Sequence, residues 1–579
     1  MARRLVGILV PTNCVSPMRQ IIFAAAAITL AAGTAAAADL PLLPPLPPAA
    51  PVLWNWTGLY WGAHLGGSFG ASSFSDPAGP GIYGGNVRSP AAMAGIQFGY
   101  NYQPNANWLI GVEADLSALN GNGTNSCMVS SGLVISANCR VRQDALATLT
   151  GRAGLVTGPG GRTLLYAKGG AAFLSERLDI TVGNPLRSST DNSDGRWGWT
   201  AGAGIEQALA PAWSVKFEYN YANFGSSDMA TPASYRLVPW VGYFPTPQGT
   251  SKVSQDLHAV KVGLNLKFGG DVDARFDDYH LRGSQAANEI VERGAVEVGG
   301  RVWYSSGRFQ KDLGNTVNQG SQNHLISRLT YQSTAASGEA FGRVDGPYDM
   351  FLKGFAGGGT LLSGRMNDED WIANRGIPYS NTLHDPVKGS IAYATLDLGY
   401  NLLRGPDYKF GGFVGYNYYR ENKSAYGCVQ TAGPTGQVCA DPVPNTVLAM
   451  TQNNTWHSLR VGFNGEIGLG RGLKLSADAA YLPYVKTFGV DNHVMRTDVT
   501  DTVSPEQGTG QGVQLEAILS YQFNNAFSVG AGARYWAMWA TTNAYTNIFG
   551  SECPCQTLPE RTERYGTFLQ AAYKFDTLN

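Results

Sequence analysis

The sequence predicts an all-β protein made of two transmembrane antiparallel β-barrels in series, the first eight-stranded and the second ten-stranded. Three observations predict this fold class. Of the 579 residues only 15% are charged, while 73 are glycine and 11% are aromatic, as is typical of strands that face lipid. Apolar and polar residues alternate with a period of two over many segments of about ten residues. Tight turns and long polar loops follow these segments in turn, like the periplasmic turns and external loops of outer-membrane barrels.

The same composition excludes several other classes of protein. A helical membrane protein with many spans would need repeated apolar runs of roughly 18 residues or more, and such a run is found only near the N-terminus. With 44% hydrophobic residues, the chain is too apolar to be disordered. The net charge of -1 offers no basic face to a nucleic acid, so we expect no nucleic-acid partner.

Residues 1–37 are expected to be a secretory signal peptide. An apolar run that begins at Ile21 ends in small residues, with a cleavage site of the Ala-x-Ala type at about Ala37. A membrane anchor helix is the alternative, but the run is short, rich in alanine and followed by proline. Residues 38–53 then form a stiff Pro-rich spacer.

Residues 54–268 are expected to form the eight-stranded barrel. Between Ser214 and Tyr221, for example, polar residues alternate with aromatic ones, so one face of the strand is wet and the other apolar. Such segments lie approximately at 55–69, 91–103, 108–120, 145–157, 162–175, 195–209, 213–225 and 259–268.

Ionisable residues recur on the polar faces of these segments. An eight-stranded barrel has an interior just wide enough to be filled by side chains, so we expect them to pair as salt bridges in the lumen. A binding or catalytic cluster is the alternative. The residues concerned are Glu113, Asp115, Arg152, Lys216 and Glu218.

Residues 269–293 are expected to be a periplasmic linker, because they are too polar to cross a membrane. The ten-stranded barrel then occupies residues 294–579. Its segments lie near 297–310, 326–342, 350–366, 391–403, 408–424, 456–469, 473–490, 512–523, 527–543 and 563–575. Both counts are even, so each set begins and ends on the periplasmic side. One fused eighteen-stranded pore is the competing topology, with the linker as an unusually long periplasmic turn.

Six cysteines remain after removal of the signal peptide, two in each of three polar loops. In an oxidising compartment, local pairing predicts disulfides between Cys127 and Cys139 and between Cys428 and Cys439. The sequence Cys553-Pro554-Cys555 is too tight for an easy internal disulfide. The spacing of histidines and cysteines does not suggest a zinc site, so no metal is expected.

Two short motifs in the second set place ionisable groups at i and i+2 at the outer ends of strands. Asp368 and Asp370 follow the third strand, and Asp491 and His493 follow the seventh. In a ring of ten, these strands face each other across the external mouth. The arrangement suits activation of water: Asp491 can orient His493, which takes the proton of a water that adds directly to a peptide carbonyl. Spacing alone is a weak signal, because Asp-x-Asp in an external loop is more often a solvated turn or a loose calcium site, and Asp-x-His can be a surface pair.

The alternation raises one difficulty for this site. The odd positions from Leu473 to Ala479 are apolar and therefore lipid-facing, and Asp491 and His493 are odd as well. A bulge or twist near Gly489 must turn these two side chains inward.

Residues 38–268 resemble the opacity-type surface antigens of the bacterial outer membrane. The resemblance rests on the segment Trp54–Ala63 after the Pro-rich leader and on the closing segment Val262–Phe268. It implies a membrane anchor or surface antigen, since that family shares no enzymatic residues.

Residues 296–575 are similar to the omptin family of outer-membrane endopeptidases, ten-stranded barrels with an external active site. The similarity runs through Leu361–Trp371, the segment from His384 to Leu403, Gly415-Tyr416 with Arg420, and Asp491–His493. All four omptin catalytic positions are filled, which implies Asp368 and Asp370 as a carboxylate couple and Asp491 and His493 as a dyad. The resemblance also implies polypeptide substrates and no cofactor. It further implies lipopolysaccharide bound to basic residues of the outer wall, Arg420 among them, and external loops on the cell surface.

The second half departs from the omptin pattern at several positions. Lys311 and Gly489 stand where omptins that cut after basic residues carry acids, and Ser380 or Asn381 replaces an acid on the leaving-group side. Tyr418 replaces the acidic companion of Arg420. Cleavage between paired basic residues is therefore not implied. The competing functions are a surface antigen or adhesin that has lost proteolysis, and a small porin.

Overall fold

The computed structural model describes the chain from residue 54 to residue 576, with gaps. The gaps are 82, 129–134, 183–187, 211, 239–240, 269–294, 316–323, 372–378, 406, 433–438, 440, 497–501 and 547–552. The predicted signal peptide, Pro-rich spacer and linker lie outside the described residues. Among the described residues, no helix is long and apolar enough to cross a membrane.

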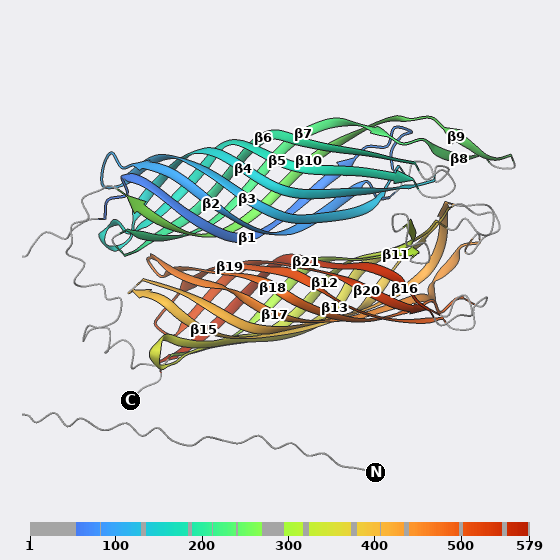
Figure 1. The fold of residues 1–579 in the computed structure, drawn as a ribbon. Coiled ribbons are helices and arrows are strands. Elements are labelled where there is room, and N and C mark those ends of the chain that lie inside the picture. Colours follow the sequence, from blue (N-terminus) through green and yellow to red (C-terminus); the bar gives the residue numbers. More distant parts are fainter. Residues whose placement is uncertain are drawn as a thin grey trace, which may run out of the picture. The chain divides into compact units, whose positions relative to one another are not determined.

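Eight long strands form the first barrel (Figure 1). They are β1 (Gly58–Phe74), β2 (Asn86–Tyr102), β3 (Trp108–Cys127), β4 (Ala137–Thr157), β5 (Thr163–Val182), β6 (Ser188–Ala210), β7 (Trp213–Thr231) and β10 (Gly249–Phe268). The ring runs in the order β1-β10-β7-β6-β5-β4-β3-β2 and closes on itself. The short strands β8 (Ser234–Val238) and β9 (Gly242–Thr246) pair with each other between β7 and β10 in the chain.

Ten long strands form the second ring. They are β11 (Ala295–Asn315), β12 (His324–Asp345), β13 (Met350–Asp370), β15 (Val387–Gly405), β16 (Tyr408–Ala432), β17 (Val443–Gly470), β18 (Leu473–Asn492), β19 (Val503–Gln522), β20 (Phe527–Thr546) and β21 (Cys553–Asp576). Each pairs antiparallel with the next along the chain, and β21 pairs back onto β11. The short strand β14 (Ser380–His384) pairs with β13 and β16.

These closures decide between the two predicted topologies. The first strand of each ring pairs with its last, β1 with β10 and β11 with β21. The alternative of one fused eighteen-stranded pore is therefore excluded, and the predicted all-β fold of two antiparallel barrels is confirmed.

Every predicted strand is found, but the strands run further at their external ends than the sequence predicts. Their periplasmic ends fall within a few residues of the prediction, as at Trp108 and Leu473. At the external end, β17 begins at Val443 where the alternation predicts 456, and β4 begins at Ala137 where it predicts 145. Lipid imposes alternation only over the roughly 10 residues that cross the hydrocarbon. Beyond the hydrocarbon, the hydrogen bonds between neighbouring strands continue, and the side chains on both faces of the strand can be polar.

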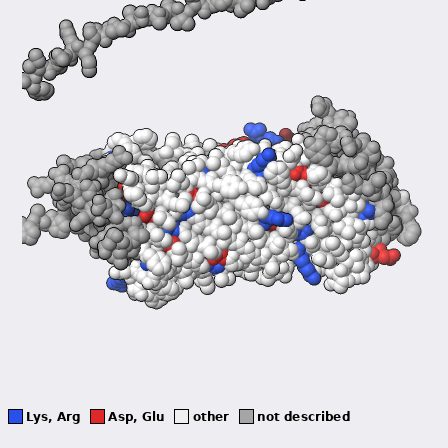
Figure 2. Space-filling view, turned by 90° about the horizontal axis from the view of Figure 1, so that it is seen from below, with Lys and Arg blue, Asp and Glu red and all other residues white. Residues whose placement is uncertain are grey.

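The outer wall of the second barrel changes from apolar to cationic along its strands. Leu362, Leu396, Tyr416 and Tyr484 are exposed on the outward face. Nearer the external ends, the exposed outward positions carry cations, which favour the lipid headgroup level over the hydrocarbon. These cations are Arg365, Lys388, Arg420 and Lys486. The membrane-spanning part of the wall therefore ends near them, and strand residues beyond them stand outside the membrane. On the face drawn in Figure 2, charged side chains are few and scattered among uncharged ones.

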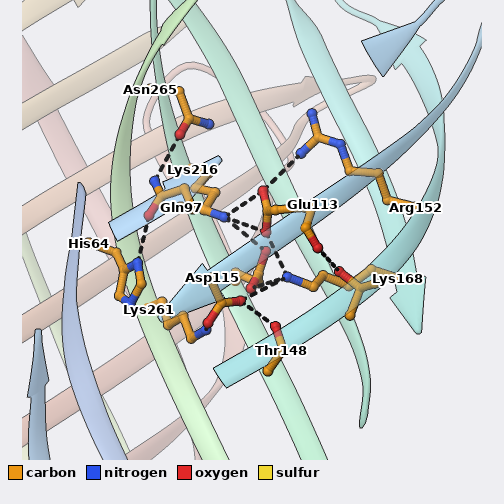
Figure 3. A network of polar contacts seen from close by, with 12 residues as sticks. His64, Gln97, Glu113, Asp115, Thr148, Arg152, Lys168, Lys216, Lys261 and Asn265 are labelled. Carbon is orange, nitrogen blue, oxygen red and sulfur yellow. Dashed lines mark hydrogen bonds and ion pairs between the residues drawn. The ribbon is translucent and has the colours of Figure 1, made fainter. Parts of the chain in front are cut away.

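The lumen of the first barrel is filled by a network of ion pairs (Figure 3). The carboxylate of Glu113 accepts hydrogen bonds from Lys168 at 2.7 Å and from Lys216 at 2.9 Å. Lys261 donates to Asp115 at 2.8 Å, and Arg152 reaches Glu206 at 3.1 Å. All of these side chains are buried. The predicted pairing of lumen charges is thus present.

Three of these acids, Glu113, Asp115 and Glu218, lie close enough together to hold a metal ion. Their oxygens already bind the ammonium groups of Lys168, Lys216 and Lys261. Because their charges are compensated by these lysines, the three acids have a structural role in filling the lumen of the barrel.

We expect the substitution Lys216→Met to destabilise the first barrel by about 3–5 kcal/mol, because Glu113 and Glu218 then share Lys168 and the buried cluster keeps one uncompensated negative charge. Urea unfolding in detergent, followed by tryptophan fluorescence, measures the change. Lys252→Met on the exposed face of β10 is the matched control and should change stability by less than about 0.5 kcal/mol. Equal stabilities of the two variants would contradict a structural role for the network.

Candidate active site

A bulge in β13 turns its last two aspartates toward the lumen. Up to Leu361, odd-numbered side chains point inward, and both Phe351 and Leu361 are buried. The pairing with β12 then skips Leu362. One extra residue reverses which positions face inward. Beyond it Met366 is buried, and Asp368 and Asp370 share its side of the strand.

A second bulge does the same on β18. The pairing with β17 passes from Tyr481 to Tyr484 opposite Leu459 and Val461, so β18 holds one residue more than its neighbour. Proline has no N–H to donate to the ladder and fits such a position, and Pro483 stands there. Odd positions then point inward, and Asp491 is only 4% exposed. The prediction that a bulge turns Asp491 inward is confirmed, but the predicted place near Gly489 is wrong.

The predicted dyad, at the end of β18, is in hydrogen-bonding contact. His493 Nε2 lies 3.2 Å from Asp491 Oδ2. The Asp491 side chain is 6% exposed, whereas the His493 side chain is 22% exposed. The backbone N–H of His493 donates to the carbonyl of Thr502 at 3.0 Å, which holds the histidine beyond the strand end. The imidazole can therefore reach a substrate, while the carboxylate behind it cannot.

Asp368 and Asp370 lie side by side on β13, and both interact electrostatically with the dyad: Asp491 acts on Asp368, and His493 acts on Asp370. Burial, together with the neighbouring carboxylates of Asp370 and Asp491, raises the pKa of Asp368 well above its usual range. Burial also raises the pKa of Asp370, against the lowering effects of the Ser327 hydroxyl and of His493. The couple therefore holds a proton at a pH where exposed aspartates have lost theirs.

Strand β14, which the sequence analysis missed, covers the couple from one side. Asp368 pairs across the ladder with Thr382, and Asp370 with Ser380. Asn381 is fully buried and donates from its side-chain amide to Asn367 at 3.0 Å. Its five residues carry no strong alternation, so no sequence signal distinguished β14 from a loop.

Lys311 is the contact that sequence reasoning did not foresee. It is 1% exposed, and its ammonium group lies 2.7 Å from Asp491 Oδ2. It also donates to Glu506 and, at 3.3 Å, to Gln452. The three acceptors stand on β18, β19 and β17, far apart in the chain, so spacing could not reveal the cluster.

The other predicted residues lie away from this site. Arg420 is exposed on the outer wall of β16, and its Nε donates to Asn422 at 3.1 Å. Both predicted disulfides are present, Cys127–Cys139 and Cys428–Cys439. The side chains of Cys553 and Cys555 lie outside the described residues.

Comparison with known proteins agrees with this division of the chain. A family model described as an outer membrane protein β-barrel domain matches residues 23–268, and the model of the omptin family matches residues 347–552. The second match contains Asp368, Asp370, Asp491 and His493.

Three individual proteins are similar to a part of this chain. The 31 kDa outer-membrane immunogenic protein of Brucella melitensis is 30% identical over 259 residues, which cover 43% of this chain and 100% of that protein. A 22 kDa outer membrane protein of Rhizobium leguminosarum is 26% identical, over 37% of this chain and 79% of that protein. The crystal structure of outer membrane protease OmpT from Escherichia coli is matched with a TM-score of 0.40 at 16% identity, over 49% of this chain and 97% of that chain.

The fold, the two family models and the relatives from Brucella and Rhizobium together define a bacterial outer-membrane protein with two barrels of different kinds. The chain belongs to the outer-membrane β-barrel proteins, its first barrel being of the surface-antigen type and its second an omptin-family domain.

We expect Asp368→Asn to stabilise the second barrel at pH 8. The raised pKa of Asp368 means that its charged form is disfavoured in the folded state. This cost is present once the pH exceeds the folded pKa, shrinks as the pH falls, and vanishes below the unfolded value of about 4. The asparagine should gain about 1–3 kcal/mol at pH 8 and nothing at low pH. Urea unfolding at several pH values measures it. The exposed Asp385→Asn is the control, and a pH-independent difference would contradict this account.

Proposed function

We propose that the second barrel is an endopeptidase, which hydrolyses peptide bonds of polypeptides at the cell exterior by means of a water activated by His493 and Asp491. One observation carries the proposal: a bulge in β13 and another in β18 turn two pairs of ionisable groups inward, and the two pairs interact electrostatically. The pairs are Asp368 with Asp370 and Asp491 with His493. Membership of the omptin family supports a protease.

In this mechanism, the exposed imidazole of His493 takes a proton from water as the water oxygen adds to the peptide carbonyl. The carboxylate of Asp491, in contact with the imidazole, holds the ring and stabilises its positive charge. The C–N bond then breaks, and the leaving amine receives a proton from His493 or from the couple of Asp368 and Asp370. No side chain forms a covalent intermediate.

Intact cells that carry the protein should cleave a peptide library, and His493→Ala and Asp368→Ala should each lower the rate about 10²–10⁴-fold, the usual contribution of acid–base groups. Mass spectrometry of the products measures the loss. His258→Ala in the first barrel, whose imidazole bonds Tyr219 on the outer wall, is the matched control and should cleave like the wild type. Unchanged cleavage in both active-site variants would overturn the catalytic assignment.

We also propose that lipopolysaccharide on the outer wall supports this activity. Four exposed cations gather at the headgroup level of the second barrel: Arg365, Lys388, Arg420 and Lys486. Lipid phosphates pair with such cations. A bound lipid would steady the wall on whose inner side the catalytic residues stand. No other cofactor is proposed.

Purified protein in detergent should gain activity when lipopolysaccharide is added, and Arg420→Ala should need about 5–30-fold more lipid for half-maximal activity, the loss expected for a charged contact of about 1–2 kcal/mol. Titration of the cleavage rate against lipopolysaccharide measures the change. Lys574→Ala, at the opposite, periplasmic end of β21 and away from these four cations, should leave the titration unchanged. Full activity of the wild type in lipid-free detergent would contradict lipid dependence.

A surface antigen or adhesin is the second candidate function, and the first barrel favours it. The relatives of this barrel include proteins named as outer-membrane immunogenic proteins. Its lumen is filled by paired charges, so a role for this barrel lies in what its loops present outside. The filled lumen also gives no support to a porin.

A further inference from the structure

We propose that Lys311 is a positioning residue of the active site, which holds Asp491 as a carboxylate and sets the pH range in which His493 acts as a base. The inference rests on the proposed endopeptidase activity and adds to it the control of its pH dependence.

The geometry places Lys311 and His493 on one oxygen atom. Asp491 Oδ2 lies 2.7 Å from Lys311 Nζ and 3.2 Å from His493 Nε2. The other oxygen, Oδ1, is shielded from solvent and has no hydrogen-bond partner within the described part of the chain. Both contacts of the carboxylate therefore converge on a single atom, and a change in one must alter the other.

Lys311 has no donor left for a substrate. An ammonium group has three N–H donors, and those of Lys311 are directed at Asp491, Glu506 and Gln452. With 1% exposure it also has no route to the exterior. It therefore acts through Asp491 and not on the peptide.

The ammonium remains charged in this position. Burial alone would lower the pKa of Lys311, but Asp491 and Glu506 raise it above its ordinary value. A fixed positive charge on Oδ2 stabilises the carboxylate and opposes a second positive charge on the imidazole. The charge of Lys311 thus acts against protonation of the imidazole through the oxygen atom that both groups contact.

Other titratable groups surround this cluster from the neighbouring strands. They are Tyr331 on β12, Asp368 and Asp370 on β13, His384 on β14, Lys423 on β16, Glu506 on β19 and Glu560 on β21. Burial raises the pKa of Tyr331, Asp368 and Glu560, and lowers that of His384 and Lys423. These five groups are thus shifted toward their neutral forms, whereas Lys311 is a charged partner in direct contact with Asp491.

The test compares pH–rate profiles of kcat/KM for peptide cleavage in three variants. Lys311→Met removes the charge, and the acid limb should move to higher pH by roughly 1–3 units, the effect of an adjacent charge. Glu506→Gln removes the second carboxylate that contacts Lys311, so the ammonium charge acts on Asp491 alone. The acid limb should then move to lower pH. Lys311→Arg keeps the charge and should restore the wild-type profile. KM should change little, because Lys311 does not touch the peptide.

A second measurement does not depend on cleavage. The chain has 7 histidines, so the His493 resonance can be assigned in detergent by its loss in His493→Ala. Its titration midpoint should move upward in Lys311→Met and downward in Glu506→Gln. The mobility difference between boiled and unboiled samples on gels shows whether each variant is folded.

The outcomes separate the two proposals. A wild type that cleaves nothing, combined with the expected shifts of the His493 titration, overturns the endopeptidase and keeps the role of Lys311. Cleavage that depends on His493, combined with a Lys311→Met profile that coincides with the wild type, overturns the role of Lys311. An upward shift in Glu506→Gln would overturn it as well.

Discussion

The need to pair every backbone N–H and C=O group inside the membrane governs the whole molecule. Hydrocarbon offers no partner for these groups, so a sheet can cross it only as a closed ring. Both rings here close first strand to last, β1 with β10 and β11 with β21. Closure then gives each strand one face for lipid and one for the lumen. Ionisable side chains are left with the lumen, the headgroup level and the external ends, which is where the described ones gather.

Because side chains alternate strictly between lumen and lipid, a single inserted residue changes the direction of every side chain beyond it. Leu362 on β13 and Pro483 on β18 each add one residue to a strand, and each insertion reverses which side chains face inward. Without them Asp368 and Asp491 would point outward. The candidate active site therefore depends on two irregularities in strands that are otherwise regular, and the ladder resumes on both sides of each.

Most of the fold could be predicted from the sequence, because period-two alternation and short turns are local signals. The periplasmic strand ends and the eighteen long strands followed from them, as Trp108 and Leu473 illustrate. The external strand ends could not be predicted in this way, because residues outside the membrane do not face lipid and need not alternate between apolar and polar. Asp368 and Asp491 were singled out by their i, i+2 motifs at strand ends, and a family resemblance then implied their catalytic role. The bulge was inferred from parity but was predicted too late in β18. The role of Lys311 could not be foreseen, since its partners come from three strands that only the closed ring brings together.

The strands that rise beyond the headgroup level have an evolutionary consequence. In β13 and β18 the side chains of the candidate active site stand on, or directly beyond, the ends of paired strands. The loops that join strands at this end can therefore change in length and composition without moving these side chains. Fusion to a barrel of the surface-antigen type adds further loops that can vary in the same way.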